Sequence, residues 1–77
     1  MNRMVLKELT DEHVVYFYYP DGIGPCGEIE YIFGEEEPKV LKLGNGDKGY
    51  FANMALDFLD DCIDADMFPF RWTVAWN

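Results

Sequence analysis

Hydrophobic and polar positions along the chain follow two periods, which predict four strands and one helix. Residues 13–19 are β-branched or aromatic almost throughout, which is typical of a strand with both faces at least partly covered. Residues 28–33 alternate at first and predict a second strand, and residues 39–43 predict a short third strand. The clean alternation of residues 70–76 predicts the last strand.

A helix is predicted from about residue 49 to residue 65, because apolar residues recur there at helical spacing. Asp47 precedes it and can accept hydrogen bonds from the free amides of the first turn. Pro69 disfavours a helical conformation for Phe68, so the helix is expected to end near residues 65–67. The side expected to be buried consists of Phe51, Ala55, Phe58, Leu59 and Cys62.

These elements predict a single α+β domain over residues 1–77, with the order β-β-β-α-β. Short connections favour an antiparallel meander of the first three strands, and a right-handed crossover through the helix brings the fourth strand parallel beside the first. Numbered along the chain, the four strands are therefore expected to lie in the order 3-2-1-4, in a mostly antiparallel sheet with the helix on one face. Residues 5–9 are left open as a short helix or an extra strand.

One helix covers only one face of such a sheet, so the other face is expected to be open. We assign Val15 and Phe17 to the helix side, and Tyr16, Tyr18 and Arg71 to the open face. Tyrosine and arginine are enriched in binding hot spots, which makes this face a candidate surface for a partner or a second copy of the chain. A partly hydrated face with cross-strand pairs explains the same residues equally well.

The composition indicates a folded, acidic protein. Of the 77 residues, 49% are hydrophobic, which is well above the range of disordered chains. Fifteen acidic residues against six basic ones give a net charge of -9, which disfavours direct binding to nucleic acid and suits a basic protein partner or simple solubility. No signal peptide or membrane span is recognisable, so we expect a soluble, cytoplasmic protein.

Four aspartates form the most informative polar pattern. Asp57, Asp60, Asp61 and Asp64 stand at i, i+3, i+4 and i+7 and predict an acidic stripe opposite the buried side of the helix. Like charges at i,i+4 destabilise a helix by about 0.2–0.5 kcal/mol per pair, and a cationic partner would relieve that repulsion. A solvated helix face is the simpler explanation. The sequence lacks a calcium-binding loop, and no metal or cofactor is predicted.

The segment from Gly22 through Gly24 to Gly27 has the spacing G-x-G-x-x-G of a phosphate-binding loop. The third glycine opens a strand pattern instead of a helix, so a hairpin turn is the favoured interpretation. Cys26 lies in this loop without a visible activating base, and His13 is expected to be a surface residue at a strand entry.

No catalytic constellation is visible, so the sequence favours a non-catalytic protein-interaction domain, acting as an adaptor, an inhibitor or a decoy. The aspartate stripe or the tyrosine face would then contact the partner. Two alternatives stay open: a small-ligand or thiol-dependent role for Cys26 and its glycine loop, and a purely structural homodimer.

Overall fold

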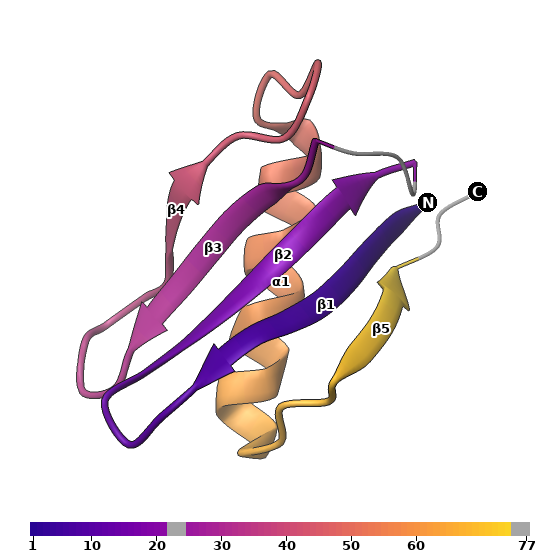
Figure 1. Cartoon of the computed structure of the whole chain (residues 1–77). Helices are drawn as coiled ribbons and strands as arrows, with labels where there is room; N and C mark the ends of the chain where they lie inside the picture. Colours follow the sequence, from indigo (N-terminus) through magenta and orange to yellow (C-terminus); the bar gives the residue numbers. More distant parts are fainter. Residues whose placement is uncertain (22–24, 75–77) are drawn as a thin grey trace.

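In the part of the chain that the computed structural model describes, residues 1–21 and 25–74, five strands form one antiparallel sheet and one helix packs against it (Figure 1). The elements are β1 (Asn2–Leu9), β2 (His13–Pro20), β3 (Gly27–Ile32), β4 (Lys39–Lys42), α1 (Tyr50–Ala65) and β5 (Arg71–Val74). The predicted α+β class, with one helix on an antiparallel sheet, is confirmed. Residues 75 and 76 of the predicted last strand lie outside the described residues.

The predicted strand order is wrong because β1 is a full strand. The sheet has the order β4-β3-β2-β1-β5, so β1 lies between the two strands that were expected to be parallel neighbours. β5 pairs antiparallel with β1 instead, in a register that places Met4 opposite Trp72. The side chains of β1 suit a position inside the sheet, with a covered face and an open face. Met4 and Leu6 face the helix, while Arg3 and Lys7 lie on the open face.

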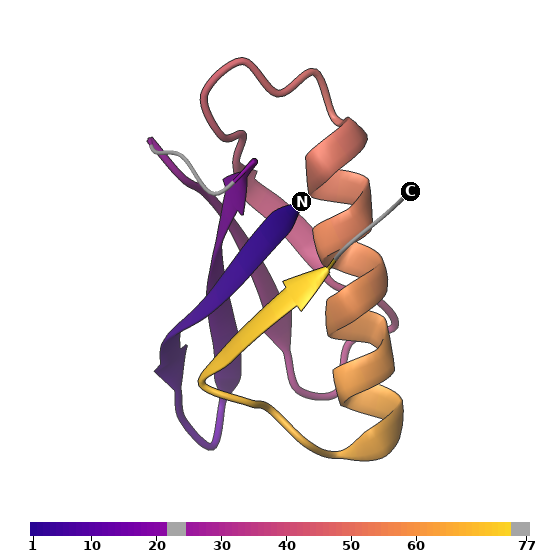
Figure 2. The same cartoon turned by 90° about the vertical axis from the view of Figure 1, so that its right-hand side faces the viewer.

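The helix lies on one side of the sheet only, and the opposite face of the sheet is open (Figure 2). The core between the two layers contains Met4, Val14, Tyr16, Tyr18, Ile29 and Tyr31 from the sheet and Ala52, Ala55, Phe58, Leu59 and Cys62 from α1. The predicted buried side of the helix is therefore confirmed, with Phe51 partly buried at its edge.

The two faces of β2 are the reverse of those predicted. Tyr16 and Tyr18 have no exposed surface and lie beneath α1, while Val15 and Phe17 lie on the opposite face. The register fixes this arrangement, because Tyr16 pairs with the buried Ile29 and Phe17 pairs with Glu28. A shift of the strand pairing by one residue moves every side chain of a strand to the other face of the sheet.

The N-cap residue of α1 is Gly49, and the preceding Asp47 binds amides of the first turn as predicted. Its carboxylate accepts hydrogen bonds from the amides of Gly49 (2.8 Å), Phe51 (3.1 Å) and Ala52 (3.0 Å). The helix ends at Ala65, followed by Asp66 in the left-handed conformation (φ 54°), in agreement with the predicted end.

Within the described residues, no helix is long and apolar enough to cross a membrane.

Candidate functional site

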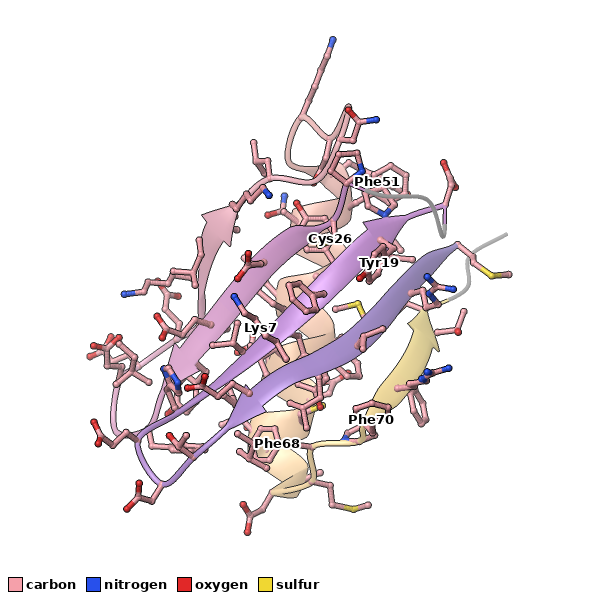
Figure 3. All side chains as sticks on the ribbon, viewed as in Figure 1. Lys7, Tyr19, Cys26, Phe51, Phe68 and Phe70 are labelled. Atoms are coloured by element: carbon pink, nitrogen blue, oxygen red, sulfur yellow. The ribbon has the colours of Figure 1, made fainter. Side chains whose placement is uncertain are left out.

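The open face of the sheet is covered by its own long polar side chains (Figure 3). The guanidinium of Arg3 lies 4.9 Å from the ring centre of Tyr19, and the Lys7 ammonium lies 5.3 Å from that of Phe17. Lys7 also forms an ion pair with Glu28 at 2.7 Å. These contacts shield the apolar surface of the face. Arg71 lies on this face as predicted, but Tyr16 and Tyr18 do not, so the predicted tyrosine surface does not exist.

His13 joins three strands at one end of this face. Its Nδ1 lies 2.6 Å from Glu30 Oε2 and its Nε2 lies 2.5 Å from Glu8 Oε1. Hydrogen bonds to Glu8 and then Glu30 raise the pKa of the imidazole above its ordinary value of 6.5. The carboxylates hold opposite ring nitrogens, and no group of three or more metal-ligating side chains among the described residues has an arrangement that could hold a metal ion.

The glycine motif is only partly described, because Gly22 and Gly24 lie outside the described residues. Gly27 opens β3 and pairs with Tyr18 on β2, and no helix follows it. A Cβ atom on Gly27 would lie 2.1 Å from Cε1 of the Tyr18 ring. This third glycine therefore makes room for an aromatic ring of the core, which is a structural reason for its presence.

The two cysteines have different surroundings. Cys26 is half-buried next to Tyr19, whose pKa is raised by burial and by this thiol. Cys62 is buried in α1, and burial raises its pKa to about 11. Cys62 is therefore protonated at neutral pH and packs as a small apolar side chain.

The predicted aspartate stripe is exposed along α1, and two of its members border a hollow. Asp57 and Asp61 lie on the side toward β5, where both line a hollow. Asp60 lies near Glu37 instead, and its pKa is raised by burial and by the surrounding charges of Asp57, Asp64 and Glu37. The stripe is therefore one group of interacting charges, of which Asp57 and Asp61 border the hollow beside β5.

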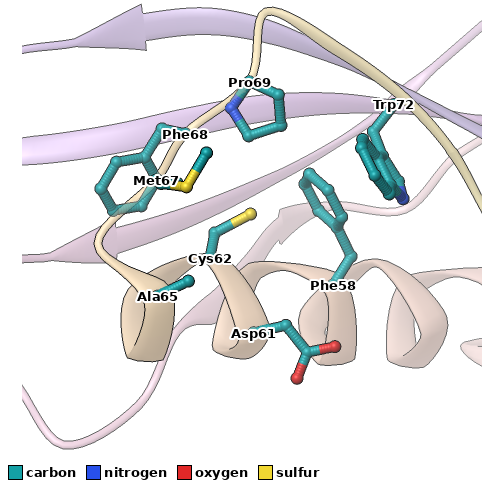
Figure 4. A pocket seen from close by; sticks show the side chains of 8 residues that line it. All are labelled: Phe58, Asp61, Cys62, Ala65, Met67, Phe68, Pro69 and Trp72. Atoms are coloured by element: carbon teal, nitrogen blue, oxygen red, sulfur yellow. The ribbon is translucent and has the colours of Figure 1, made fainter.

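A groove separates α1 from β5 and its preceding segment (Figure 4). It consists of two adjoining hollows of about 410 Å³ each, which share Phe58, Asp61 and Trp72. The first hollow is completed by Cys62, Ala65, Met67, Phe68 and Pro69, and the second by Met54, Asp57, Thr73 and Val74. We call this surface the α1–β5 groove.

The first hollow of the groove is mainly apolar, whereas the second is about equally polar and apolar and is bordered by carboxylates. Phe58 and Trp72 stack across it with ring centres 6.4 Å apart and an interplanar angle of 28°. Trp72 is nevertheless 55% exposed, and the neighbouring Met67 is 68% exposed. The carboxylates of Asp57 and Asp61 border this apolar surface from α1. Such a surface suits a ligand that combines an apolar side chain with positive charge.

Tyr16 supports the groove from inside the core. Its hydroxyl donates a hydrogen bond to the carbonyl of Pro69 at 2.5 Å, and its ring meets Phe58 edge-on with ring centres 5.1 Å apart. Burial raises the pKa of Tyr16 well above its ordinary value of 10.0. The groove was not foreseen from the sequence, although the exposed residues of the segment from Met67 to Trp72 are unusually apolar for a sheet edge.

Comparisons of the chain with protein-family models, with curated proteins and with solved structures gave no match.

Proposed function

We propose that the chain is a non-catalytic protein-interaction domain that binds a basic, partly apolar segment of a partner protein in the α1–β5 groove. The observation that carries this proposal is the exposed ring of Trp72, stacked on the buried ring of Phe58, beside the carboxylates of Asp57 and Asp61. An apolar hollow next to a tryptophan is the usual site of an interaction hot spot. Adaptor, inhibitor and decoy roles all use such a surface.

The charge of the chain supports a basic partner. Its net charge is -9, and the two groove aspartates are one helical turn apart, so they repel one another as long as they face water. A lysine or arginine of the partner would lie near both carboxylates and relieve this repulsion. The field of the whole chain would also accelerate encounter with a positively charged protein.

A selection from a library of short random peptides tests the proposal directly. Peptides enriched on the immobilised chain are expected to combine apolar and basic residues, and synthetic copies are then titrated by calorimetry. Trp72→Ala should weaken binding by about 30-fold, as expected for a hot-spot residue. Tyr50→Ala removes an exposed aromatic residue that does not line the groove, and it should leave the affinity within about twofold.

A matched pair of variants isolates the role of the two groove aspartates. Asp57→Asn/Asp61→Asn and Asp60→Asn/Asp64→Asn remove the same charge from the same helix, but only the first pair lines the groove. The first variant should lose about tenfold in affinity and most of the salt dependence, and the second should lose much less. Equal effects of the two variants, or binding that is unaffected by Trp72→Ala, would refute the proposed site. Failure to enrich any peptide would count against the interaction itself.

A further inference from the structure

We infer that the partner segment binds as an extended strand added to the outer edge of β5, an inference that rests on the proposed function and specifies its binding mode. Its backbone would pair with β5, and alternate side chains would enter the α1–β5 groove beneath. Main-chain hydrogen bonds would then supply affinity, and the groove would supply the sequence preference.

The outer edge of β5 is unpaired in the described part of the chain, because β5 is the terminal strand of the sheet. The Leu6 amide donates to the Phe70 carbonyl at 2.8 Å, so the backbone polar groups of Phe70 point toward β1. Antiparallel pairing alternates along a strand, and those of Trp72 therefore point the same way. The amides and carbonyls of Arg71 and Thr73 consequently face the free edge, where they can pair with an incoming strand.

The opposite edge of the sheet carries the features that prevent such pairing. β4 is bordered by Pro38 and begins and ends with lysines, and its register with β3 is interrupted between Glu28 and Ile29. Prolines, lysines and bulges are the usual means of protecting an edge strand. β5 has a regular register with β1, follows exposed Phe70 and ends at half-buried Val74, and it carries one basic residue, Arg71, where β4 carries two lysines. The contrast marks β5 as the accepting edge.

The groove lies where a strand beside β5 would place its side chains. Trp72, Thr73 and Val74 of β5 all line the second hollow, together with Phe58 and Asp61 of α1. Side chains of an added strand alternate between the two faces of the sheet. Those on the helix side would contact the rings of Phe58 and Trp72 and approach the aspartate pair, whereas those on the other side would lie near Arg71. This arrangement favours apolar and basic residues at alternate positions only.

The same edge could in principle pair with β5 of a second copy. Each chain, however, carries a net charge of -9, and two copies joined at this edge would bring their groove aspartates to the same side of one sheet. Like charges in proximity oppose such an assembly, whereas a basic segment is attracted to the same place. The occupant we infer is therefore a partner strand.

Hydrogen exchange tests the binding mode on the intact chain, with synthetic copies of the peptides enriched by the selection. Bound peptide should slow exchange of the Arg71 and Thr73 amides by at least about tenfold, because both become hydrogen-bonded. The Trp72 amide, which already faces β1, should change much less. Trp72 and Met54 side-chain shifts without protection of the two outer amides would show groove binding without strand addition, which overturns this inference and leaves the proposed function intact.

A second test uses a pair of substitutions at one position. Thr73→Pro removes the amide that faces the free edge and should reduce affinity about tenfold or more. Thr73→Val keeps that amide and has high strand propensity, so it should bind the peptides clearly more tightly than Thr73→Pro. Circular dichroism establishes that both variants fold, and equal affinities of folded variants would contradict the inference. Concentration-dependent dimerisation without peptide binding would favour the second copy and overturn it too.

Discussion

The hydroxyl of Tyr18 donates a buried hydrogen bond to the carboxylate of Asp47 at 2.6 Å, and thereby links the central part of the sheet to the start of α1. The same hydroxyl accepts a hydrogen bond from the Gly44 amide at 2.8 Å. Burial and the Asp47 carboxylate raise the pKa of Tyr18 to about 12, so the phenol remains protonated and available as a donor at neutral pH. One side chain therefore holds both ends of the segment that enters the helix.

Tyr18→Phe should reduce the free energy of unfolding by about 1–3 kcal/mol, because it leaves the Gly44 amide unpaired and removes one donor from Asp47. The ring itself is kept, so packing is little changed. Urea denaturation followed by circular dichroism measures the loss. Glu36→Gln changes an exposed side chain in the β3–β4 connection and serves as the control, with an expected change below about 0.5 kcal/mol. Equal stabilities of the two variants would rule out the linking role of Tyr18.

Gly27→Ala should destabilise the fold by about 1–3 kcal/mol or more, because the new methyl group would overlap the Tyr18 ring. In a Tyr18→Ala background the same substitution should have a much smaller effect, since the overlapping ring is absent. A double-mutant cycle measured by urea denaturation gives the coupling between the two positions. Additive effects would show that Gly27 is required for another reason.

Tyr16→Phe should loosen the segment that closes the groove, because the Pro69 carbonyl loses the hydrogen bond that holds it against the core. We expect a stability loss of about 1 kcal/mol and weaker binding of the selected peptides. Amide exchange of residues 67–70 should become faster, whereas that of β3 should not change. Unchanged amide exchange in residues 67–70 would show that the Tyr16 hydroxyl does not stabilise this segment.

The His13 imidazole should titrate above its ordinary pKa of 6.5, because Glu8 and Glu30 stabilise its charged form. A raised pKa in the folded state means that its contribution to stability is complete below about pH 6.5 and is lost as the pH rises through the raised value. NMR titration of the ring protons measures this pKa directly. Glu8→Gln should lower it, and Glu12→Gln, which leaves both carboxylate contacts in place, is the matched control.

Asp60→Asn should stabilise the fold by a few tenths of a kcal/mol at neutral pH and low salt, because it removes a partly buried charge and relieves repulsion from Asp57 and Asp64. The pKa of Asp60 is raised in the folded state. Its contribution to the stability of the fold is therefore most favourable at low pH and is lost as the pH rises through that pKa. Thermal unfolding at low and high salt measures the effect. A gain that persists undiminished at high salt would exclude repulsion between the aspartates as its main cause.

The sequence predicted the helix well because its pattern depends on local spacing. The buried residues Ala55, Phe58, Leu59 and Cys62 recur at helical intervals, and Asp47 stands where its carboxylate can bind amides of the first turn. These features depend only on neighbours along the chain. Helix position could therefore be read from residues 47–66 alone.

The faces of β2 could not be read in the same way. Residues 14–19 are all apolar or aromatic, so no alternation distinguishes the side of Tyr16 from that of Phe17. The register with β3 decides which side chains of β2 face the helix, and in this register the small Gly27 lies opposite Tyr18. Charged Arg3 and Lys7 then cover the aromatic rings of the other face, an arrangement that requires β1 to be present beside β2.

Only part of the candidate site could be predicted from the sequence. The exposure of Asp57 and Asp61 follows from their helical spacing, but their position beside an apolar groove depends on the strand order. The insertion of β1 moves β5 to the edge of the sheet, where Trp72 remains half exposed. The alternating pattern predicts Trp72 to be a core residue, but in the structure it is part of the surface.

The proposed strand addition at β5 would also set the number of partners that one molecule binds. Open-ended fibres require head-to-tail contacts, in which β5 of one copy would pair with β4 of the next. The interrupted register and the lysines of β4 make it a poor acceptor, so such a chain of copies has no second site from which to grow. A chain with one accepting edge would form complexes of fixed stoichiometry, and it would keep an apolar edge exposed without polymerising.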